Sequence, residues 1–247
     1  MNQKKFVSYD SAESVSRAVE TRRSLRAFLD TPVPEKVIAQ ILDTAARAPS
    51  GVNMQPWKVY VLTGSTRKAL CESVCRDFDN PEIKPETDVA YYPSSWFEPY
   101  VSRRRQVGWD LYGLLDIKKG DREKTHQQHR RNYQFFDAPV GLMFTVHKDL
   151  ATGSWLDYGM FLQNIMLLAR EAGLHTCPQA AWPDYHHAIR RVLPLSDEEV
   201  VVCGMAVGYA DTSAIENTLV TTRVPFGRFC PISRLAGVWI VADLASL

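Results

Sequence analysis

The sequence lacks the features of a membrane-spanning or secreted protein. No charge-free apolar run approaches the roughly 20 residues that a transmembrane helix requires. The N-terminal stretch carries lysines but no apolar core behind them, unlike a signal peptide. The cysteines, at positions 71, 75, 177, 203 and 230, are odd in number and form no Cys-x-x-Cys pair, which favours reduced thiols. We therefore expect a cytoplasmic protein with no membrane segment and no disulfide framework.

The sequence also lacks a basic excess and the common nucleotide-binding loops. Its 29 Lys and Arg residues face 28 Asp and Glu residues, and the net charge of +1 argues against a general nucleic-acid binder. It contains no Gly-x-Gly-x-x-Gly fingerprint after a strand, no Walker A loop and no Gly-x-Ser-x-Gly elbow. His126 and His129 form a His-x-x-His pair, but no carboxylate pattern accompanies them, so we predict no metal site. Any redox cofactor must be held by other means.

The spacing of apolar residues predicts helices packed on a central sheet. A chain of 247 residues, 45% of them apolar, can build one large domain or two small ones. Because the predicted strands do not alternate strictly with helices, we expect the α+β class. The stretch 81–132 is rich in proline and is predicted to be irregular at first, whereas the mixed segment 223–247 gives no prediction. Helices are predicted at 15–21, 35–47, from 66, at 101–115 and at 156–172, and strands at 58–62, 139–146 and 199–207.

Three arginines and a serine lie close together early in the chain. The guanidinium group of arginine is a rigid fork of donors that matches phosphate oxygens, and a serine hydroxyl adds one more donor. Arg22, Arg23, Ser24 and Arg26 could therefore grip a phosphate. A solvated charged turn is the alternative interpretation of these residues taken alone.

Two further segments combine small residues with neutral hydrogen-bonding groups. Residues 48–57 leave a helix and lead into a strand, and Gly51 permits close approach of the backbone to a flat ligand. Residues 173–182 follow a long helix, and their small side chains would let backbone amides meet a ligand edge. The alternatives are an ordinary helix-to-strand loop and a plain helix-to-loop transition. The candidate residues are Pro49, Ser50, Gly51, Asn53 and Gln55 in the first segment, and Pro178, Gln179, Ala180 and Ala181 in the second.

Taken in order, these segments resemble the nitroreductase family of FMN enzymes. The resemblance rests on Arg-Arg-Ser-x-Arg at 22–26 followed by Ala-Pro-Ser-Gly-x-Asn-x-Gln-Pro-Trp at 48–57. The segments Gly-Leu-x-Thr-Cys-Pro at 173–178 and Asn-Thr-Leu-Val-Thr-Thr-Arg at 217–223 are also similar to that family. The resemblance covers residues 15–223 and is weakest over residues 77–133. Within that stretch, residues 92–105 look like members that act on nitrobenzoates and related nitroarenes.

The resemblance implies an α+β fold with a central mixed or antiparallel sheet flanked by helices, in an intertwined homodimer with two FMN sites at its interface. Residues 1–247 would form a single FMN-binding domain with a variable, lid-like segment around 81–132. The implied activity is reduction of a nitroaromatic or quinone-like small molecule by NAD(P)H, through a ping-pong two-electron mechanism. The alternatives on the same fold are reductive dehalogenation, flavin breakdown, dehydrogenation, or flavin binding without catalysis.

The resemblance also assigns roles to the arginines and the serine. By position, Arg22, Ser24 and Arg223 would hold the FMN phosphate, and Arg23 would lie along the ribityl chain. Arg26 would face the pyrimidine edge of the flavin near N1 and O2, where a fixed cation stabilises negative charge. No side chain is assigned as a nucleophile or general base, because the cofactor performs the chemistry.

The remaining flavin contacts come from the two small-residue segments. Pro49, Ser50, Gly51, Asn53 and Gln55 would come from the partner subunit, and residues 178–181 would run past the dimethylbenzene and N5 side. Two departures from the family pattern stand out. Many members carry Glu-Gly where this chain has Ala180-Ala181, and many carry a lysine where this chain has Thr221.

The segment 91–112 is unusually aromatic and basic. Over residues 101–131 the chain has nine Lys or Arg against four Asp or Glu, so the basic charge is concentrated there. One hypothesis is a lid beside the flavin, in which aromatic rings stack on a planar acceptor and an arginine attracts its carboxylate. The alternative is an interface helix with solvated arginines. The candidate substrate residues are Trp96, Tyr100, Arg103, Trp109 and Tyr112.

Overall fold

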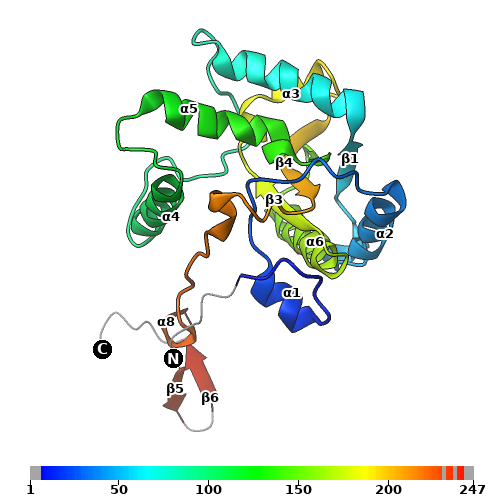
Figure 1. The fold of residues 1–247 in the computed structure, drawn as a ribbon. Helices are drawn as coiled ribbons and strands as arrows, with labels where there is room; N and C mark the ends of the chain where they lie inside the picture. The colour runs from blue at the N-terminus through cyan, green and yellow to red at the C-terminus, as the bar shows by residue number, and fades with distance from the viewer. Residues whose placement is uncertain (1–6, 230–231, 236–237, 242–247) are drawn as a thin grey trace.

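The computed structural model of the chain describes residues 7–229, 232–235 and 238–241. Within those residues a four-stranded antiparallel sheet has the order β1-β2-β4-β3 (Figure 1). The two central strands are the most apolar, and nearly all of their residues are buried, as expected for strands covered on both faces. The strands are β1 (Lys58–Leu62), β2 (Val140–His147), β3 (His175–Gln179) and β4 (Glu199–Gly208), with a separate ribbon of β5 (Ile232–Leu235) and β6 (Val238–Val241).

Helices cover both faces of the sheet, and each face has its own apolar core. On one face, α2 and α6 pack against side chains such as Leu142, Phe144 and Met205. On the other face, α3, α7 and two short 3₁₀ helices pack against Met143 and Ala206. The helices are α1 (Val15–Thr21), α2 (Glu35–Ala45), α3 (Gly64–Asp79), α4 (Tyr100–Leu114), α5 (Arg122–Arg130), α6 (Thr152–Glu171), α7 (His186–Arg190) and α8 (Phe226–Phe229), with 3₁₀ helices η1 (Gly51–Asn53), η2 (Arg131–Asp137), η3 (Trp182–Asp184) and η4 (Ile215–Thr218).

The second core depends on two glycines in the central strands. The rings of Phe135 and Trp182 stack with their centroids 4.4 Å apart. A Cβ atom at Gly141 would lie 2.5 Å from Phe135, and one at Gly204 would lie 2.3 Å from Trp182. These distances are too short for any side chain. The glycines therefore let a stacked aromatic pair lie directly against the backbone of the sheet.

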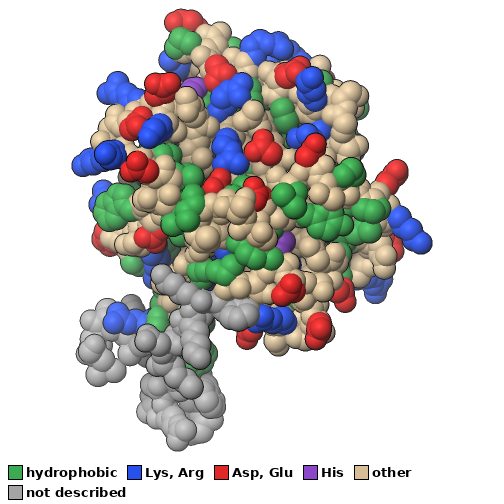
Figure 2. Space-filling model, viewed as in Figure 1, with side chains coloured by type: hydrophobic (Ala, Val, Ile, Leu, Met, Phe, Trp, Pro, Cys, Tyr) green, Lys and Arg blue, Asp and Glu red, His purple; other side chains and the backbone are tan. Residues whose placement is uncertain are grey.

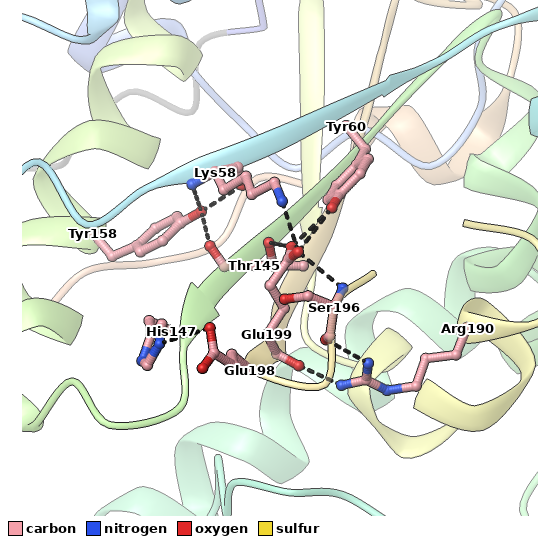
Figure 3. Close-up of polar contacts among 9 residues, drawn as sticks. All are labelled: Lys58, Tyr60, Thr145, His147, Tyr158, Arg190, Ser196, Glu198 and Glu199. Atoms are coloured by element: carbon pink, nitrogen blue, oxygen red, sulfur yellow. Dashed lines mark hydrogen bonds and ion pairs between the residues drawn. The ribbon is translucent and has the colours of Figure 1, made fainter. Parts of the chain in front are cut away.

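A buried carboxylate joins three strands at one end of the sheet. Glu199, at the start of β4, is 6% exposed and accepts hydrogen bonds from Lys58 Nζ at 2.6 Å and Tyr60 Oη at 2.8 Å, both on β1. Thr145 of β2 donates at 2.7 Å, and the backbone N–H of Ser196 donates at 3.1 Å. Figure 3 shows these groups converging on the carboxylate. Burial alone would raise the pKa of Glu199, but the hydrogen bonds outweigh it and lower that pKa to about 2.

The α+β prediction is confirmed, and the predicted strands and helices are present with shifted ends. The helix predicted at 156–172 begins at Thr152, and the one predicted at 35–47 ends at Ala45. β3, α5 and α7 were not predicted, and neither were the short 3₁₀ helices. β3 is an edge strand containing Pro178, which weakens its strand signal, and the segment is therefore not the plain loop that small residues suggested.

Another unpredicted element, α5, is polar on every face. Gln128 is its one buried residue, so its sequence has no apolar stripe that would predict a helix. Asp121 caps its N-terminus by accepting from Lys124 N, and Asp79 of α3 accepts from His126 and Arg130. The His126 side chain is therefore hydrogen-bonded to Asp79, and the His129 side chain is hydrogen-bonded to Tyr112.

No helix among the described residues has both the length and the apolarity to cross a bilayer.

Candidate functional site

The arginine segment runs along the free edge of β3. Ser24 forms an isolated parallel bridge with Thr176, and Leu25 N donates to Thr176 O at 3.2 Å. Exposure alternates along the segment, as it does in a strand: Leu25 is buried, while Ser24 and its second neighbours on either side are partly exposed. Arg22, Ser24 and Arg26 therefore lie in one row, with their donors on the same side.

Arg23 points away from that row. Its guanidinium group is 9% exposed, lies 5.3 Å from the centre of the Tyr9 ring, and donates from Nη1 to Asn217 O at 2.6 Å. Its Nε and Nη2 atoms are buried without a hydrogen-bond partner. Arg23 thus anchors the segment to η4 and retains unsatisfied donors beneath the row.

Asn217 connects the arginine segment to the second predicted phosphate-binding segment, 217–223. Its side chain is 1% exposed and accepts from Arg26 N at 2.8 Å. The same amide donates to Ala27 O at 2.8 Å and to Asp211 O at 2.9 Å. The hydrogen bonds of this one buried side chain to Arg26 and Ala27 fix the end of the arginine row.

Arg223 lies close to Arg22, and neither has an ion-pair partner among the described residues. Burial, and then the charge of Arg223, lower the pKa of Arg22. Arg223 donates to Thr221 Oγ1 at 2.7 Å, so Thr221 orients the guanidinium group of Arg223. Two adjacent cations without carboxylates are an arrangement that favours an anion.

The end of β3 contacts the last part of the lid-like segment. Gln179 is 3% exposed and donates from Nε2 to Asn132 O at 2.5 Å, while Tyr133 Oη donates to Ala181 O at 3.4 Å. Pro178, Ala180 and Ala181 are partly exposed, whereas the Oε1 atom of Gln179 is buried and unpartnered. The side chain of Gln179 therefore faces the protein interior, and its neighbours carry the accessible surface.

The loop 49–55 is exposed and strained. Val52, Asn53 and Gln55 have φ angles of 43°, 60° and 50°, in a region that costs energy for non-glycine residues, above all for a β-branched one. Gly51 N donates to Asp157 Oδ2 at 3.0 Å, and Gln55 N donates to Ser50 Oγ at 3.0 Å. The Val52 side chain is 95% exposed. These hydrogen bonds hold a loop conformation in which residues 51–55 remain exposed within this chain.

The loop lies at the opposite end of α6 from the arginine row. Asp157, which holds Gly51, is near the start of α6, whereas Arg170 is near its end. Thirteen residues of helix span about 20 Å. Arg170 donates to Asp10 O and His175, and its charge interacts with that of Arg23, which places it beside segment 22–26 on the Arg23 side. The structure therefore brings together segments 22–26, 176–181 and 217–223, but not 49–55, within one chain.

The predicted substrate residues lie on and beside α4, which packs against η4. No residue of α4 is buried, and Figure 2 shows hydrophobic side chains on the front face, some of them at the left where α4 lies. The aromatic rings have cationic neighbours: Arg104 lies 4.9 Å from the Trp96 ring, and Arg103 lies 5.7 Å from that of Tyr100. Trp109 is 66% exposed, and Tyr112 Oη pairs with His129 Nε2 at 2.8 Å.

A cleft of about 670 Å³ lies elsewhere, between α2 and β1. Its lining includes Val33, Ile38, Leu42 and Val61, together with Arg67, and none of the predicted site residues. Arg22, Ser24 and Arg26 of the arginine row are partly exposed. A cofactor held there would need further cover from outside the chain.

Comparison with known proteins gives this geometry a family. The model of the nitroreductase family matches residues 19–209, which is most of the chain. The chain belongs to the nitroreductase family.

Relatives within the nitroreductase family cover nearly the whole chain. A 4-nitrobenzoate reductase of Nocardioides sp. (strain LMS-CY) is 41% identical over 87% of this chain and 88% of its own. A chloronitrobenzene nitroreductase of Comamonas testosteroni is 39% identical over 85% of this chain and 93% of its own. A crystal structure of the FMN- and NADPH-dependent nitroreductase NfnB from sphigopyxis sp. strain HMH has a TM-score of 0.87 at 36% identity, covering 90% of this chain and 100% of that one.

Two buried polar residues of this nitroreductase-family chain are absent from the predicted site. Asn217 begins a segment that resembles the family, but the sequence alone suggests no role for its amide. Asp157, 7% exposed, is the one acidic residue among the buried residues of α6, and it orients Gly51. An acid in step with the apolar residues of a helix is a sequence signal that could have identified Asp157.

Proposed function

We propose that this chain is an FMN-dependent oxidoreductase that uses NAD(P)H to reduce nitroaromatic or similar electron-poor small molecules. The observation that carries the proposal is the row of Arg22, Ser24 and Arg26 along β3, with Arg223 beside it and no ion-paired carboxylate on either among the described residues. The names of the most similar relatives agree with this function. Nitroarene reductases are 38–42% identical to the chain, whereas an iodotyrosine dehalogenase homologue from Caenorhabditis elegans is 24% identical, which disfavours the dehalogenation alternative.

The donor set fits FMN. Arg22, Ser24 and Arg223 supply charged and hydroxyl donors suited to a phosphate group, and the unpartnered buried donors of Arg23 lie beneath them. Arg26 carries a cation further along the same row, where it can stabilise negative charge on the isoalloxazine ring. The small residues Pro178, Ala180 and Ala181 leave a flat ligand room to approach the backbone.

When bound, FMN supplies hydride transfer between the nicotinamide and the acceptor. The part played by the chain is to bind, orient and polarise. The Asn217 amide fixes the backbone of Arg26, so its charge is held in place before reaction, which lowers the cost of reorganisation. Thr221 and the backbone of Thr222 orient the guanidinium of Arg223.

The function is tested by measuring FMN binding and turnover in the same protein. Purified protein should release FMN, not FAD, and plots of 1/rate against 1/[NADPH] at several nitrobenzoate concentrations should be parallel. Arg22→Ala should weaken FMN binding by about 1.5–3 kcal/mol, because it removes charge-assisted hydrogen bonds. Arg76→Ala, an exposed arginine of α3, is the matched control and should bind FMN normally. Protein that takes up no added FMN would refute the proposal.

We further propose a homodimer in which loop 49–55 of each subunit completes the FMN site of the other. The loop lies about 20 Å along α6 from the arginine row of its own chain, so a site that uses both needs two chains. Its strained backbone and the bare side chains of Val52 and Met54, 95% and 49% exposed, support an occupant that covers it.

Val52→Asp should disrupt that dimer. A carboxylate at the centre of an apolar contact cannot be solvated, so we expect monomers in size-exclusion chromatography with light scattering, together with loss of FMN. Ile83→Asp, a matched change at a side chain 37% exposed outside the loop, should leave the dimer intact. A wild-type monomer that retains FMN would overturn this arrangement.

We propose that residues 81–132 form a lid within a single FMN-binding domain, 1–247. Support comes from the hydrogen bond between Asn132 of this segment and Gln179 and from the packing of α4 on η4. Combined alanine substitution of Arg103, Arg104 and Arg105 should then raise KM for nitrobenzoate more than for nitrobenzene, and the difference should shrink as salt increases. Equal changes for both acceptors at every ionic strength would assign these arginines to structure.

We also propose that the protein acts in the cytoplasm. Four cysteines, Cys71, Cys75, Cys177 and Cys203, are free thiols in the described part of the chain, as expected in a reducing compartment.

A further inference from the structure

Three potential metal-binding side chains converge where the lid-like segment meets α7. They are Glu86, His186 and His187, and one ligand atom from each lies within 4.8 Å of the others. The convergence is held by the backbone: Glu86 N donates to Asp184 O at 2.9 Å, and Glu86 forms an isolated bridge with Tyr185. The group thus joins two stretches of chain that are far apart in sequence.

The buried histidine of this group lacks the partners that buried polar atoms normally have. His186 is 6% exposed, and neither ring nitrogen makes a hydrogen bond. Its Nδ1 atom lies 3.5 Å from Asp88 Oδ2, whereas its Nε2 atom is in no ion pair among the described residues. The rings of His186 and His187 lie with their centroids 3.9 Å apart. A buried ring nitrogen without a hydrogen-bond partner, beside two other potential ligand atoms, indicates that a bound species outside the protein chain interacts with this group.

We propose that Glu86, His186 and His187 bind a divalent transition-metal ion, with Zn²⁺ as the reference ion. Two imidazoles and one carboxylate are ligands that Zn²⁺ accepts, and tetrahedral bonds of about 2.0 Å place neighbouring ligand atoms about 3.3 Å apart. His187 Nε2 and Glu86 Oε2 are already 3.5 Å apart. Asp88 beside His186 Nδ1 matches the outer carboxylate that usually accepts the second N–H of a ligating histidine.

The bound ion would tie the start of the lid-like segment to the core of the protein. Glu86 belongs to that segment, whereas His186 and His187 open α7, which packs against α3. None of the three residues belongs to the arginine row or to loop 49–55. The metal site is therefore independent of the proposed oxidoreductase activity, and its role is to hold the segment in place.

Calorimetric titration of tag-free, EDTA-treated protein with ZnCl₂ tests the site. Wild type should bind one ion per chain, and His187→Gln and Glu86→Gln should each weaken binding about tenfold or more. Both residues are exposed, so the substitutions should not disturb folding. His147→Gln is the matched control, because His147 also has two carboxylate neighbours, Asp149 and Glu198, but on opposite ring nitrogens, where they cannot share one ion.

Amide hydrogen exchange is a second measurement, and it shows where in the chain the ion binds. Added Zn²⁺ should slow exchange in peptides covering 82–92 and 184–190 of wild type, but not of His187→Gln. Absence of stoichiometric binding, or equal binding by wild type and both variants, would overturn the proposal. Slowed exchange elsewhere without protection of 82–92 would also overturn it, because the ion would then lie at another group such as the cysteines.

Discussion

Replacing Glu199 with glutamine should lower the free energy of unfolding at neutral pH by about 3 kcal/mol, because a buried carboxylate with four donors is replaced by a neutral amide. The same magnitude follows from proton binding. A carboxyl group whose pKa falls from 4.5 to about 2 on folding contributes about 3 kcal/mol above both values. Urea unfolding followed by circular dichroism measures the change.

The pH dependence should identify the charge of Glu199 as the cause. Since folding depresses its pKa, the stabilisation is complete above 4.5 and is lost as the pH falls from 4.5 towards 2. Wild type should therefore lose stability over that range more steeply than Glu199→Gln. Glu198→Gln is the matched control, because the neighbouring Glu198 side chain is 65% exposed and contacts His147 alone among the ion pairs of the described residues. Equal losses in both variants would rule out the buried network as the source.

Asn217→Ala should have the largest effect on the cofactor site among residues that are not expected to touch FMN. The substitution removes three hydrogen bonds and leaves the buried Arg26 N–H unsatisfied, at a cost of about 2–4 kcal/mol. Because Arg26 and segment 217–223 would lose their connection, we expect the dissociation constant for FMN to increase at least roughly tenfold. That increase corresponds to a loss of about 1.4 kcal/mol in binding free energy. Fluorescence titration of the apoprotein with FMN measures this effect.

Asn164→Ala controls for loss of an amide. Asn164 is partly buried, and its side chain makes one hydrogen bond, to Ala45 O at 3.2 Å, on the α2 side of α6. The Asn164→Ala protein should have a somewhat lower free energy of unfolding and a normal affinity for FMN. If Asn217→Ala bound FMN as tightly as Asn164→Ala, the connection between the two arginine segments would have no part in holding the cofactor.

The sequence predicts those parts of the fold in which periodicity and burial agree. β2 and β4 are continuous apolar runs, and α6 repeats Phe161 and Ile165 at helical spacing, so each appears nearly where expected. The polar helix α5 and the proline-containing strand β3 carry no such signal. They form because of tertiary partners, Asp79 for α5 and the ladder of β4 for β3, that a local pattern cannot reveal.

The candidate site shows the same division. Residue types and spacing pointed to Arg22, Ser24 and Arg26, and the extended backbone places them in one row. The hydrogen bonds that Arg23 and Arg26 make with Asn217 join residues nearly 200 positions apart in the chain. A local sequence pattern cannot predict such contacts. It also cannot predict how far loop 49–55 lies from the arginines.

The stacked pair of Phe135 and Trp182 limits how this sequence can change over time. Gly204 has room for no side chain while an indole lies over it, and the ring at 182 cannot shrink without opening a hole beneath Phe135. Each position is thus fixed by the other, and neither can drift by single neutral steps. A lineage that gains a side chain at 204 must lose bulk at 182, so the two positions should vary together across descendants or not at all.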